Sequence, residues 1–509
     1  QRKTCLDRHD QNNGPADGLR NRHRKSTLGC RGGCGEKTRS RTVVGNVAAE
    51  YTAGFRRRAG HPSSMSKTLP LTPFERCMLL QDSAAYPCHC FIRLHFQGRL
   101  DREAFTAALQ KTLPGHPLLR ATVTSGWRDR WSFADGVQPE LLWCEGETGG
   151  PLPQAKPIDL GRESGLKVYV VQGAVNVEVT FQFHHACCDG AGMERFIDDL
   201  FVRYAHLRTN GEIASDATTV DPDRVASRGT YGLRLAKLLK LLPGQMVGLL
   251  GAAQFLGRHP KPLLDHPARD RQAESTAAFP SLKSFRFEKS QTLALRNTAN
   301  ERNVTLHELL VRDFFLALWD WQKELDQYHD RHWVRMMIPM NMRDASYRSL
   351  PAMNYVSSVF LDRRGKDSVD RDQLLNGIHD EMQVIKRFQL EFTFLWFLKL
   401  LHWIPGGLKR SVQQDTCQLS VIFSNTGKMT RRCPLPRTDG CLQVADLVLH
   451  DMDGLAPLRP YNCVTMLTLE YAHRLKLNLH YDAQFVTARQ SEKLMDLFVA
   501  RLHDSIQSR

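Results

Sequence analysis

The chain has 509 residues, of which 42% are hydrophobic and 24% are charged, so it is long enough for two or three folded units and too apolar to be disordered throughout. Its formal net charge is +15 at pH 7, but residues 1–64 hold 14 Lys and Arg against 5 Asp and Glu, which leaves only +6 on the remainder. This distribution does not indicate a nucleic-acid-binding core, and we expect no nucleic acid among the partners.

Residues 1–64 are rich in Gly, Arg, Asn and Ser, and the first methionine of the chain is Met65. A segment of this composition cannot bury enough apolar surface to fold, so we expect a basic disordered leader. Two interpretations stand: a functional basic arm, or upstream sequence that is translated without a role. The composition favours the second.

After the leader the pattern is that of a mixed α/β protein. Leu69–Leu80 has a Thr-Pro start followed by apolar residues at helical spacing, and Asp101–Leu113 is a second amphipathic helix. Cys90–Phe96 alternates as a strand. Two strands at Leu166–Val171 and Val175–Phe183 form a hairpin. These elements make up a first half, residues 65–207.

Residues 208–282 are rich in charged residues, Pro and Gly, and we interpret them as a linker with an inserted amphipathic segment. Its apolar run Leu233–Leu256 and a later run, Phe388–Leu408, are both interrupted by charged residues, so neither is an uncharged span of roughly 18–20 residues. A buried helix is favoured over a membrane-surface helix for both runs. A lipid-facing role of Leu233–Leu256 stays open, and with it a peripheral membrane contact.

A second half, residues 283–509, repeats the α/β pattern. It begins with a short strand at Ser284–Phe287 and a helix at Asn303–Trp321. The later predicted elements are strands at Val334–Pro339, Val356–Phe360 and Leu419–Phe423, a hairpin of Cys463–Leu469 with Leu475–Tyr481, and a closing helix at Ser491–Leu502. The sequence therefore predicts two α/β halves of similar size.

The strand Val175–Phe183 leads into the segment HHACCDGAG. Its odd positions are apolar and its even positions polar, so the odd side chains should face the core, with His185 on the buried face and His184 on the other. Apolar residues at helical spacing resume at Met193, which makes Asp189 a helix cap. A desolvated imidazole stays neutral, the form that a general base needs. The alternative is a core histidine with ordinary hydrogen-bond partners.

The 13 cysteines are scattered and form no paired CxxC clusters, so neither a zinc ribbon nor a disulfide framework is indicated. A metal site of His184, His185, Cys187 and Cys188 is not favoured, because adjacent side chains on opposite faces do not converge on one ion. Free thiols and the absence of an apolar secretory signal at the start of the sequence favour a cytoplasmic protein.

Several stretches together match one family pattern. HHACCDG fits HHxxxDG, and LTPFERCML, FQGRLDREAFTAALQKTLPGHPLLRATV, NVTLHELLVRDFFLAL, IPMNMRD, MNYVSSVF and FSNTG follow in the expected order. In these stretches the chain resembles the chloramphenicol-acetyltransferase-like superfamily. That superfamily includes nonribosomal-peptide condensation domains, wax ester/diacylglycerol synthases, alcohol O-acetyltransferases and polyketide-associated acyltransferases. The resemblance covers Pro70 to Leu502 and departs from the pattern at the apolar insert around residues 230–258 and at the Cys-Cys pair of the signature.

The resemblance implies an α/β fold of two chloramphenicol-acetyltransferase-like subdomains in a V-shaped pseudo-dimer, with a tunnel at their interface. An acyl thioester would enter at one end and the acceptor at the other. His185 would be the general base, and His184 would hold the turn beside it.

The resemblance also implies supporting residues. Asp189 would orient the loop through an ion pair with a distant arginine, for which Arg343 is the candidate, with a solvated loop arginine beside Asp344 as the alternative. Gly190 would give the loop backbone freedom, and Asn354 would lie near the tunnel. The donor to the oxyanion stays open among Ser357, Ser358 and Thr465.

Taken together, these features predict an acyltransferase that moves an acyl group from acyl-CoA to an acceptor hydroxyl. Since no Gly-x-Ser-x-Gly or similarly activated nucleophile is present, direct transfer is favoured over an acyl-enzyme. We expect no tightly bound cofactor, a small-molecule alcohol or amine as acceptor, and a monomer. The alternatives are a condensation-type enzyme that uses carrier-protein-bound acyl groups, which the lack of a carrier motif after the last helix disfavours, and a non-catalytic scaffold.

Overall fold

The computed structural model describes residues 68–126, 128–133, 136–150, 156–209, 220–231, 235–265, 280–343, 349–368 and 370–507, all within one compact unit that spans Ser64–Arg509. The interpretation of residues 1–64 as a disordered leader lies outside this part of the chain.

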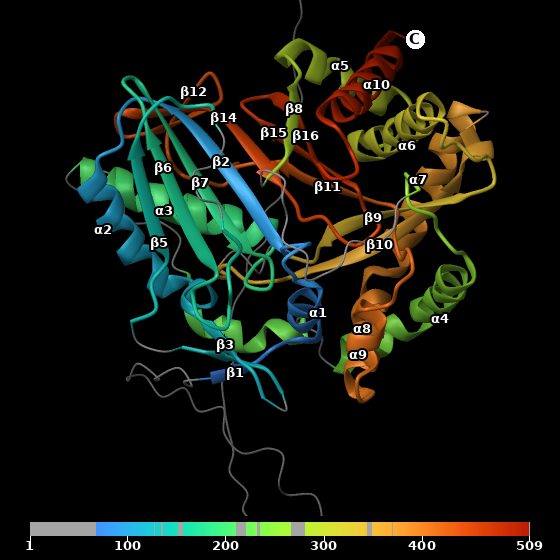
Figure 1. Cartoon of the computed structure of the whole chain (residues 1–509), viewed down its shortest axis with the longest axis horizontal. Helices are drawn as coiled ribbons and strands as arrows, with labels where there is room; N and C mark the ends of the chain where they lie inside the picture. Colours follow the sequence, from blue (N-terminus) through green and yellow to red (C-terminus); the bar gives the residue numbers. More distant parts are fainter. Residues whose placement is uncertain are drawn as a thin grey trace, which may run out of the picture. The chain divides into compact units, whose positions relative to one another are not determined.

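A seven-stranded sheet carries the HHACCDG segment, with strand order β12-β13-β14-β2-β7-β6-β5. All neighbouring strands are antiparallel except β5 and β6, which are parallel. Helices α2 and α3 lie side by side against this sheet (Figure 1). The bounds are β2 His89–Gln97, β5 Glu140–Glu145, β6 Leu166–Gln172, β7 Asn176–His184, β12 Arg437–Thr438, β13 Cys441–Val444, β14 Leu447–Leu455, α2 Arg102–Thr112 and α3 Gly190–Arg208.

A six-stranded sheet follows the order β10-β9-β11-β15-β16-β8, and its central strand β11 is parallel to both neighbours. Helices α5, α6 and α10 contact one another above it (Figure 1). The bounds are β8 Leu282–Arg286, β9 Trp333–Asn341, β10 Val356–Arg364, β11 Val421–Lys428, β15 Val464–Tyr471, β16 Arg474–Tyr481, α5 Lys289–Glu301, α6 Leu306–Glu324, α7 Arg371–Phe388 and α10 Ala488–Gln507.

The remaining elements connect or flank the two sheets. A three-stranded sheet, β1-β4-β3, lies beside α1, which begins after Thr72 in a capping box with Glu75. Their bounds are β1 Thr68–Pro70, β3 Thr122–Thr124, β4 Arg130–Ser132, α1 Pro73–Gln81, α4 Leu235–Gly257, α8 Glu391–Trp403 and α9 Gly407–Val412, with short 3-10 helices at Leu113–Gly115, Pro117–Arg120, Pro222–Thr230 and Gly365–Ser368.

The C-terminal part of the chain contributes strands to the first sheet. β14 lies in the C-terminal part of the sequence, yet it pairs with β2 in the first sheet, with Leu455 opposite Phe91 and Met452 opposite Leu94. β12 and β13 extend the same sheet. This pairing covers an edge of β2 that would otherwise expose unpaired backbone groups. A division of the chain at residue 283 therefore does not match the assignment of strands to sheets.

Both faces of β7 are buried, which corrects the expected orientation of the two histidines. Phe181 and Phe183 face α3, as predicted, but Gln182 and His184 on the opposite face are equally inaccessible. The reason is a covering segment: the Gln182 side chain donates to the carbonyl of Lys156 at 2.9 Å. Since β7 ends at His184, His185 falls in the turn and is only partly buried, the reverse of the expected arrangement.

The predicted elements of both halves are present to within a few residues, so the α/β pattern is confirmed. Helices α5, α7 and α9 and strands β1, β3, β4, β5 and β12 to β14 had not been predicted. α4 lies in the inserted segment, and its stretch Leu239–Gly257 is long and apolar enough to cross a membrane by length and composition. Only 22% of that stretch is buried, so the preference for a buried helix is wrong at α4.

Candidate active site

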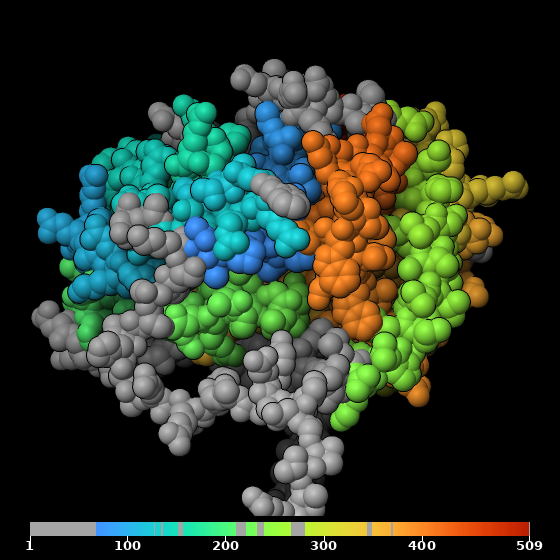
Figure 2. Space-filling model, turned by 90° about the horizontal axis from the view of Figure 1, so that it is seen from below, coloured from blue at the N-terminus to red at the C-terminus, as the bar shows by residue number. Residues whose placement is uncertain are grey.

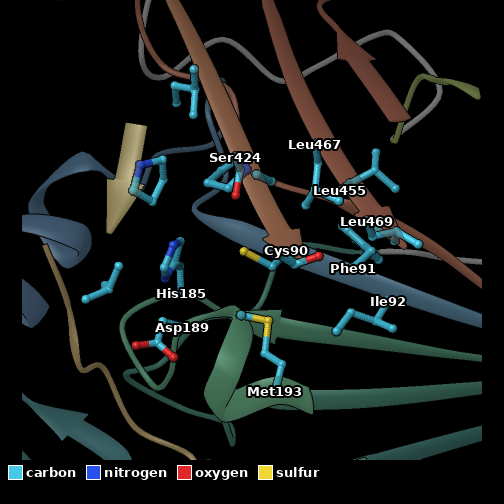
Figure 3. Close-up of a pocket in the computed structure, with 18 of the residues that line it drawn as sticks. Cys90, Phe91, Ile92, His185, Asp189, Met193, Ser424, Leu455, Leu467 and Leu469 are labelled. Atoms are coloured by element: carbon cyan, nitrogen blue, oxygen red, sulfur yellow. The ribbon is translucent and has the colours of Figure 1, made fainter. Parts of the chain in front are cut away.

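A cavity of about 100 Å³ lies where the two sheets meet. Strands β2 and β14 of the first sheet, strands β9, β10, β11 and β15 of the second, and the first turn of α3 all contribute to its wall. Figure 3 shows His185 toward one end of this pocket and Leu455, Leu467 and Leu469 toward the other. The wall is mostly apolar, so a polar group that enters the pocket finds few side chains with which it can form a hydrogen bond.

The contacts of His185 fix the state of its ring. Nδ1 lies 3.1 Å from the carbonyl oxygen of Cys188. A carbonyl only accepts hydrogen bonds, so Nδ1 carries the proton and Nε2 keeps a free lone pair. Burial lowers the pKa of His185, and the positive charge of Arg459 lowers it further. The ring that lines the pocket is therefore neutral near pH 7 and presents a proton acceptor.

His184 does not line the pocket. Its ring is fully buried, and Nδ1 accepts a hydrogen bond from the backbone N–H of Ala186 at 3.1 Å. Nε2 lies 3.4 Å from a carboxylate oxygen of Asp82. These contacts attach the histidine turn to the segment that follows α1, so His184 supports the position of its neighbour rather than contacting a ligand.

Asp82, His89 and His184 bring three metal-ligand atoms within 4.8 Å of one another. Hydrogen bonds account for this cluster. His89 Nε2 accepts the backbone N–H of Ile158 at 3.2 Å, and Asp82 accepts the N–H of Cys88 at 2.8 Å. Burial lowers the pKa of His89 to about 3, so this ring is neutral. We assign no metal to the cluster, because its acceptor atoms already accept hydrogen bonds from backbone N–H groups of the surrounding loops.

Cys187 and Cys188, the two cysteines of the signature, are fully buried. Burial raises the pKa of both thiols well above the ordinary value, so both stay protonated and fill space as small apolar groups. A Cβ at Gly165 would overlap the sulfur of Cys187. The Cys-Cys departure from the family pattern is thus matched by a glycine immediately before β6.

The Asp189 carboxylate joins the histidine turn to the second half of the chain. Oδ1 accepts the N–H of Gly192 at 2.9 Å and thereby caps α3. Oδ2 accepts from Arg343 Nη1 at 2.8 Å and from the N–H of Tyr355 at 2.6 Å. Arg343 also donates to the carbonyl of Met353 at 2.8 Å. This ion pair is the one that the resemblance implies.

Asn354 acts on the same turn from the other side. Its side-chain Nδ2 donates to the carbonyl oxygens of His185 and Ala186 at 2.9 and 2.8 Å. The residue is buried, so these hydrogen bonds face little competition from water. Arg343 follows β9 and Asn354 precedes β10. Together their side chains hold the backbone that presents His185.

The role expected of Gly190 is not found. Gly190 begins α3 without a positive φ, and a Cβ there would make only an ordinary contact of 3.7 Å with Thr426. Gly192 is the constrained position, since a Cβ would lie 3.0 Å from both the N and O atoms of Met353. The close approach of the helix to this segment, rather than backbone freedom, requires the glycine.

None of the three expected oxyanion donors lines the pocket. Ser357 donates to the carbonyl of Glu391 at 2.5 Å, and Thr465 donates to that of Pro457 at 3.3 Å. Ser358 belongs to a separate groove bordered by α4, α7, α8 and β10. All three residues lie on the predicted strands. The hydroxyls of Ser357 and Thr465 are engaged by other groups, and Ser358 lines the other groove.

Four polar residues that the sequence did not single out also line the pocket: Ser424, Thr426, Asp453 and Arg459. The Asp453 carboxylate is paired with His95 and Lys476. Figure 3 shows Ser424 across the pocket from His185. The hydroxyl of Thr426 donates to Thr468 O at 3.3 Å and is thereby engaged elsewhere. Arg459 Nε is buried without a hydrogen-bond partner among the described residues. Ser424 could have been found, because it lies in the FSNTG stretch.

Cys90 also lines the pocket, and it is the cysteine among the described residues of the pocket wall. Burial raises the pKa of Cys90 far above the ordinary value, and the charge of Asp189 raises it further. The thiolate is the reactive form, so Cys90 is not activated for covalent catalysis.

With the geometry established, the chain can be compared with known proteins. No protein-family model matches it. Two uncharacterized proteins of Mycobacterium tuberculosis, from strains CDC 1551 / Oshkosh and ATCC 25618 / H37Rv, are each 24% identical over 387 residues, which cover 72% of this chain and 84% of theirs.

Solved structures resemble the whole fold. The first condensation domain of the calcium-dependent antibiotic synthetase, in complex with a substrate analogue, matches with a TM-score of 0.62 and 15% identity, covering 87% of this chain and 97% of that one. The chain has the condensation-domain fold.

Two further structures extend this likeness. The epimerization domain of tyrocidine synthetase B matches at TM-score 0.60 and 13% identity, with coverages of 89% and 99%. The starter condensation domain of rhizomide synthetase, a mutant in complex with C8-CoA and Leu-SNAC, matches at 0.61 and 13%, with coverages of 86% and 95%. The expected fold of two related α/β halves is confirmed. Identities this low carry no activity from one protein to another.

Proposed function

We propose that the protein is an acyltransferase that moves an acyl group from a thioester to an acceptor hydroxyl, with His185 as general base. The acceptor oxygen attacks the thioester carbonyl carbon, so that a C–O bond forms and the C–S bond breaks. His185 Nε2 takes the hydroxyl proton and returns it to the leaving sulfur. One observation carries this proposal: the Nδ1–Cys188 hydrogen bond leaves Nε2 as the acceptor of a neutral ring in the pocket wall.

Direct transfer is preferred over a covalent intermediate. The thiol of Cys90 is protonated, and no other activated sulfur or serine nucleophile lines the described pocket. His185 then acts by position and by proton transfer. Both halves of the chain supply the wall, so they hold donor and acceptor together.

Ser424 and Arg459 are our candidates for stabilising the negative charge that develops on the carbonyl oxygen. Ser424 has a hydroxyl on the opposite wall, and Arg459 brings a cation without a carboxylate partner among its described contacts. Donors placed in an apolar pocket are worth more than the same donors in water.

We propose acyl-CoA as the donor. The complex of the rhizomide starter condensation domain with C8-CoA supports this choice, because that domain has the same fold. The second candidate is a condensation-type reaction of carrier-protein-bound acyl groups that yields an amide or ester. The similarity to condensation domains of peptide synthetases supports that candidate.

The test measures thiol release. Full-length protein is incubated with acetyl- to palmitoyl-CoA and a panel of alcohols and amines, and in a parallel arm with the same acyl groups on carrier proteins. We expect release of CoA with alcohols, no requirement for an added cofactor, and a loss of at least about 100-fold in His185→Gln. His259→Gln, an exposed histidine, is the matched control.

The outcomes separate the hypotheses. Turnover only with carrier-bound acyl groups supports the condensation reaction and overturns the CoA donor. An unchanged His185→Gln rate overturns the base. Binding of CoA without turnover on any acceptor supports a non-catalytic scaffold.

A further inference from the structure

Helix α4 contacts the protein closely through two glycines and a glutamine. Gly244 and Gly248 face α7 and α8, and a Cβ at Gly244 would lie 2.8 Å from the carbonyl oxygen of Phe388. Between them Gln245 accepts the hydroxyl of Thr393 at 2.7 Å. The buried Leu241 and the partly buried Phe255, whose ring packs against Phe360, complete the inner face of this helix.

The outer face of α4 is apolar. Six large side chains recur along it at helical spacing and are more than half exposed: Leu239, Leu242, Met246, Leu249, Leu250 and Leu256. A surface helix of a soluble protein has the opposite arrangement, with its apolar stripe toward the core. α4 departs from that rule, because its solvent-facing side is apolar as well as its inner side.

Helix α8 lies beside α4 on this side of the molecule (Figure 2). Leu400, Trp403 and Ile404 at its C-terminal end are exposed, Trp403 by 70%. Nine of the twelve large hydrophobic side chains exposed in the described residues therefore lie on α4 and at the end of α8. We call these nine residues the α4–α8 face. A patch this concentrated marks an interaction surface.

The charged residues on α4, on α8 after Glu391 and on α9 are all basic, whereas the carboxylates of Asp362, Asp367, Asp370 and Glu381 lie in the groove that α4 and α8 border. Lys240, Lys399, Lys409 and Arg410 are exposed on these elements. No aspartate or glutamate occurs within residues 235–257 or 392–414. Basic residues at the border of an apolar surface complement anionic lipid headgroups, at about 1 kcal/mol for each charge near the bilayer.

We propose that the α4–α8 face docks on the surface of an anionic lipid bilayer, with α4 and α8 in the plane of the interface. A spanning orientation of α4 would require its inner face to leave α7 and α8, with which Gly244, Gly248 and Gln245 make close contacts. The Lys399 ammonium lies 5.6 Å from the ring centre of Trp403, and this pairing of a cation with an aromatic ring suits the headgroup level. These features favour lipid over a second protein.

Co-sedimentation of the full-length protein with vesicles tests this proposal. One set of vesicles is phosphatidylcholine with about one third phosphatidylglycerol, and the other is phosphatidylcholine alone. We expect binding to the anionic set. Leu242→Glu and Leu249→Glu should each lower the partition coefficient about tenfold, since each removes an apolar side chain from the buried interface. Leu293→Glu, a leucine exposed to a similar degree on α5, should bind like wild type.

Two further readouts separate lipid docking from other causes. Lys399→Gln with Lys409→Gln should lower binding to anionic vesicles by roughly 25-fold, about fivefold for each charge. Trp403 should shift its emission to the blue on binding, and Trp403→Phe should lose that component.

Equal binding of wild type and Leu242→Glu would overturn the proposal, because another segment would then carry the affinity. A wild-type protein that stays in solution with both vesicle sets would also overturn it. So would a dimer in sedimentation velocity that Leu249→Glu dissociates, which would assign the face to a second copy of the chain. Circular dichroism and thermal unfolding of each variant check that these exposed substitutions leave the fold intact.

Discussion

Asp189 gives the sharpest test of how the site is held. Replacement by Ala removes three acceptor contacts together: the N–H of Gly192, the N–H of Tyr355 and the guanidinium of Arg343. The Arg343 side chain is only 10% accessible, so its charge would stay in a largely desolvated place without its carboxylate.

The magnitude follows from this burial. Loss of one partner of a buried ion pair costs about 3–5 kcal/mol, because the other charge stays behind uncompensated. An exposed pair is worth about 0–1 kcal/mol. Lys493 and Glu324 form such a pair at 2.9 Å with nearly half of each side chain exposed. Asp189→Ala should therefore lower the free energy of unfolding by about 3–5 kcal/mol, and Lys493→Met by less than about 1 kcal/mol.

Urea unfolding followed by tryptophan fluorescence measures both variants, and Asp189→Asn and Arg343→Met complete the set. Asp189→Asn keeps an oxygen for the N–H of Gly192, so it should cost less than Asp189→Ala. Turnover should fall in all three site variants, because the turn that presents His185 moves. If Asp189→Ala unfolds like Lys493→Met and keeps full activity, the ion pair is not what positions the turn.

The remaining predictions concern pH, packing and chemistry. Burial lowers the pKa of His95, but its hydrogen bonds to Asp453 at 2.7 Å and Glu178 at 2.9 Å outweigh this and raise it to about 9. The stabilisation is complete below pH 6.5 and is lost as the pH rises through 9, so unfolding free energy should drop by about 3 kcal/mol across this window. His95→Gln should flatten that dependence in urea titrations at pH 6, 7.5 and 9. Gly192→Ala should destabilise by about 1–3 kcal/mol, whereas Gly190→Ala should be within about 1 kcal/mol of wild type in the same assay. Cys90→Ser should keep turnover within roughly threefold, and a loss of 100-fold would restore a covalent role for this residue. Desolvation lowers the pKa of His185, so the rate should hold below pH 6.5 before it falls; a limb centred at or above 6.5 would contradict the proposed neutral base.

The sequence predicted what local periodicity and short motifs encode. Alternation defined β2, β6 and β7, and helical spacing defined α2, α3 and α6. The resemblance of the family stretches paired Asp189 with Arg343, although 154 residues separate them. It placed Asn354 only near the tunnel, and the hydrogen bond of its side chain to the histidine turn is a finding of the structure. Helix α7 could have been found too, since its buried residues Leu374, Ile378, Met382 and Ile385 follow helical spacing.

Features that depend on contacts between distant parts of the chain could not be predicted from the sequence. The even face of β7 looks polar, but the covering segment around Lys156 buries it, so His184 and not His185 is the inaccessible ring. Ser424 and Arg459 line the same pocket as His185 only because the two sheets converge. The amphipathic pattern of α4 was recognised, yet a pattern does not say which face turns toward the protein.

The distribution of these contacts implies that neither half of the chain contains a complete site. The backbone of the histidine turn belongs to the first half, but Arg343, Asn354 and the N–H of Tyr355 hold it from the second. The edge of β2, whose Cys90 lines the pocket, is covered by β14. Separate expression of residues 65–207 would therefore leave an open strand edge and a buried carboxylate without its cation. Activity should appear only when both halves are present, because the residues that orient the base and the strand that closes its pocket come from the C-terminal part of the chain.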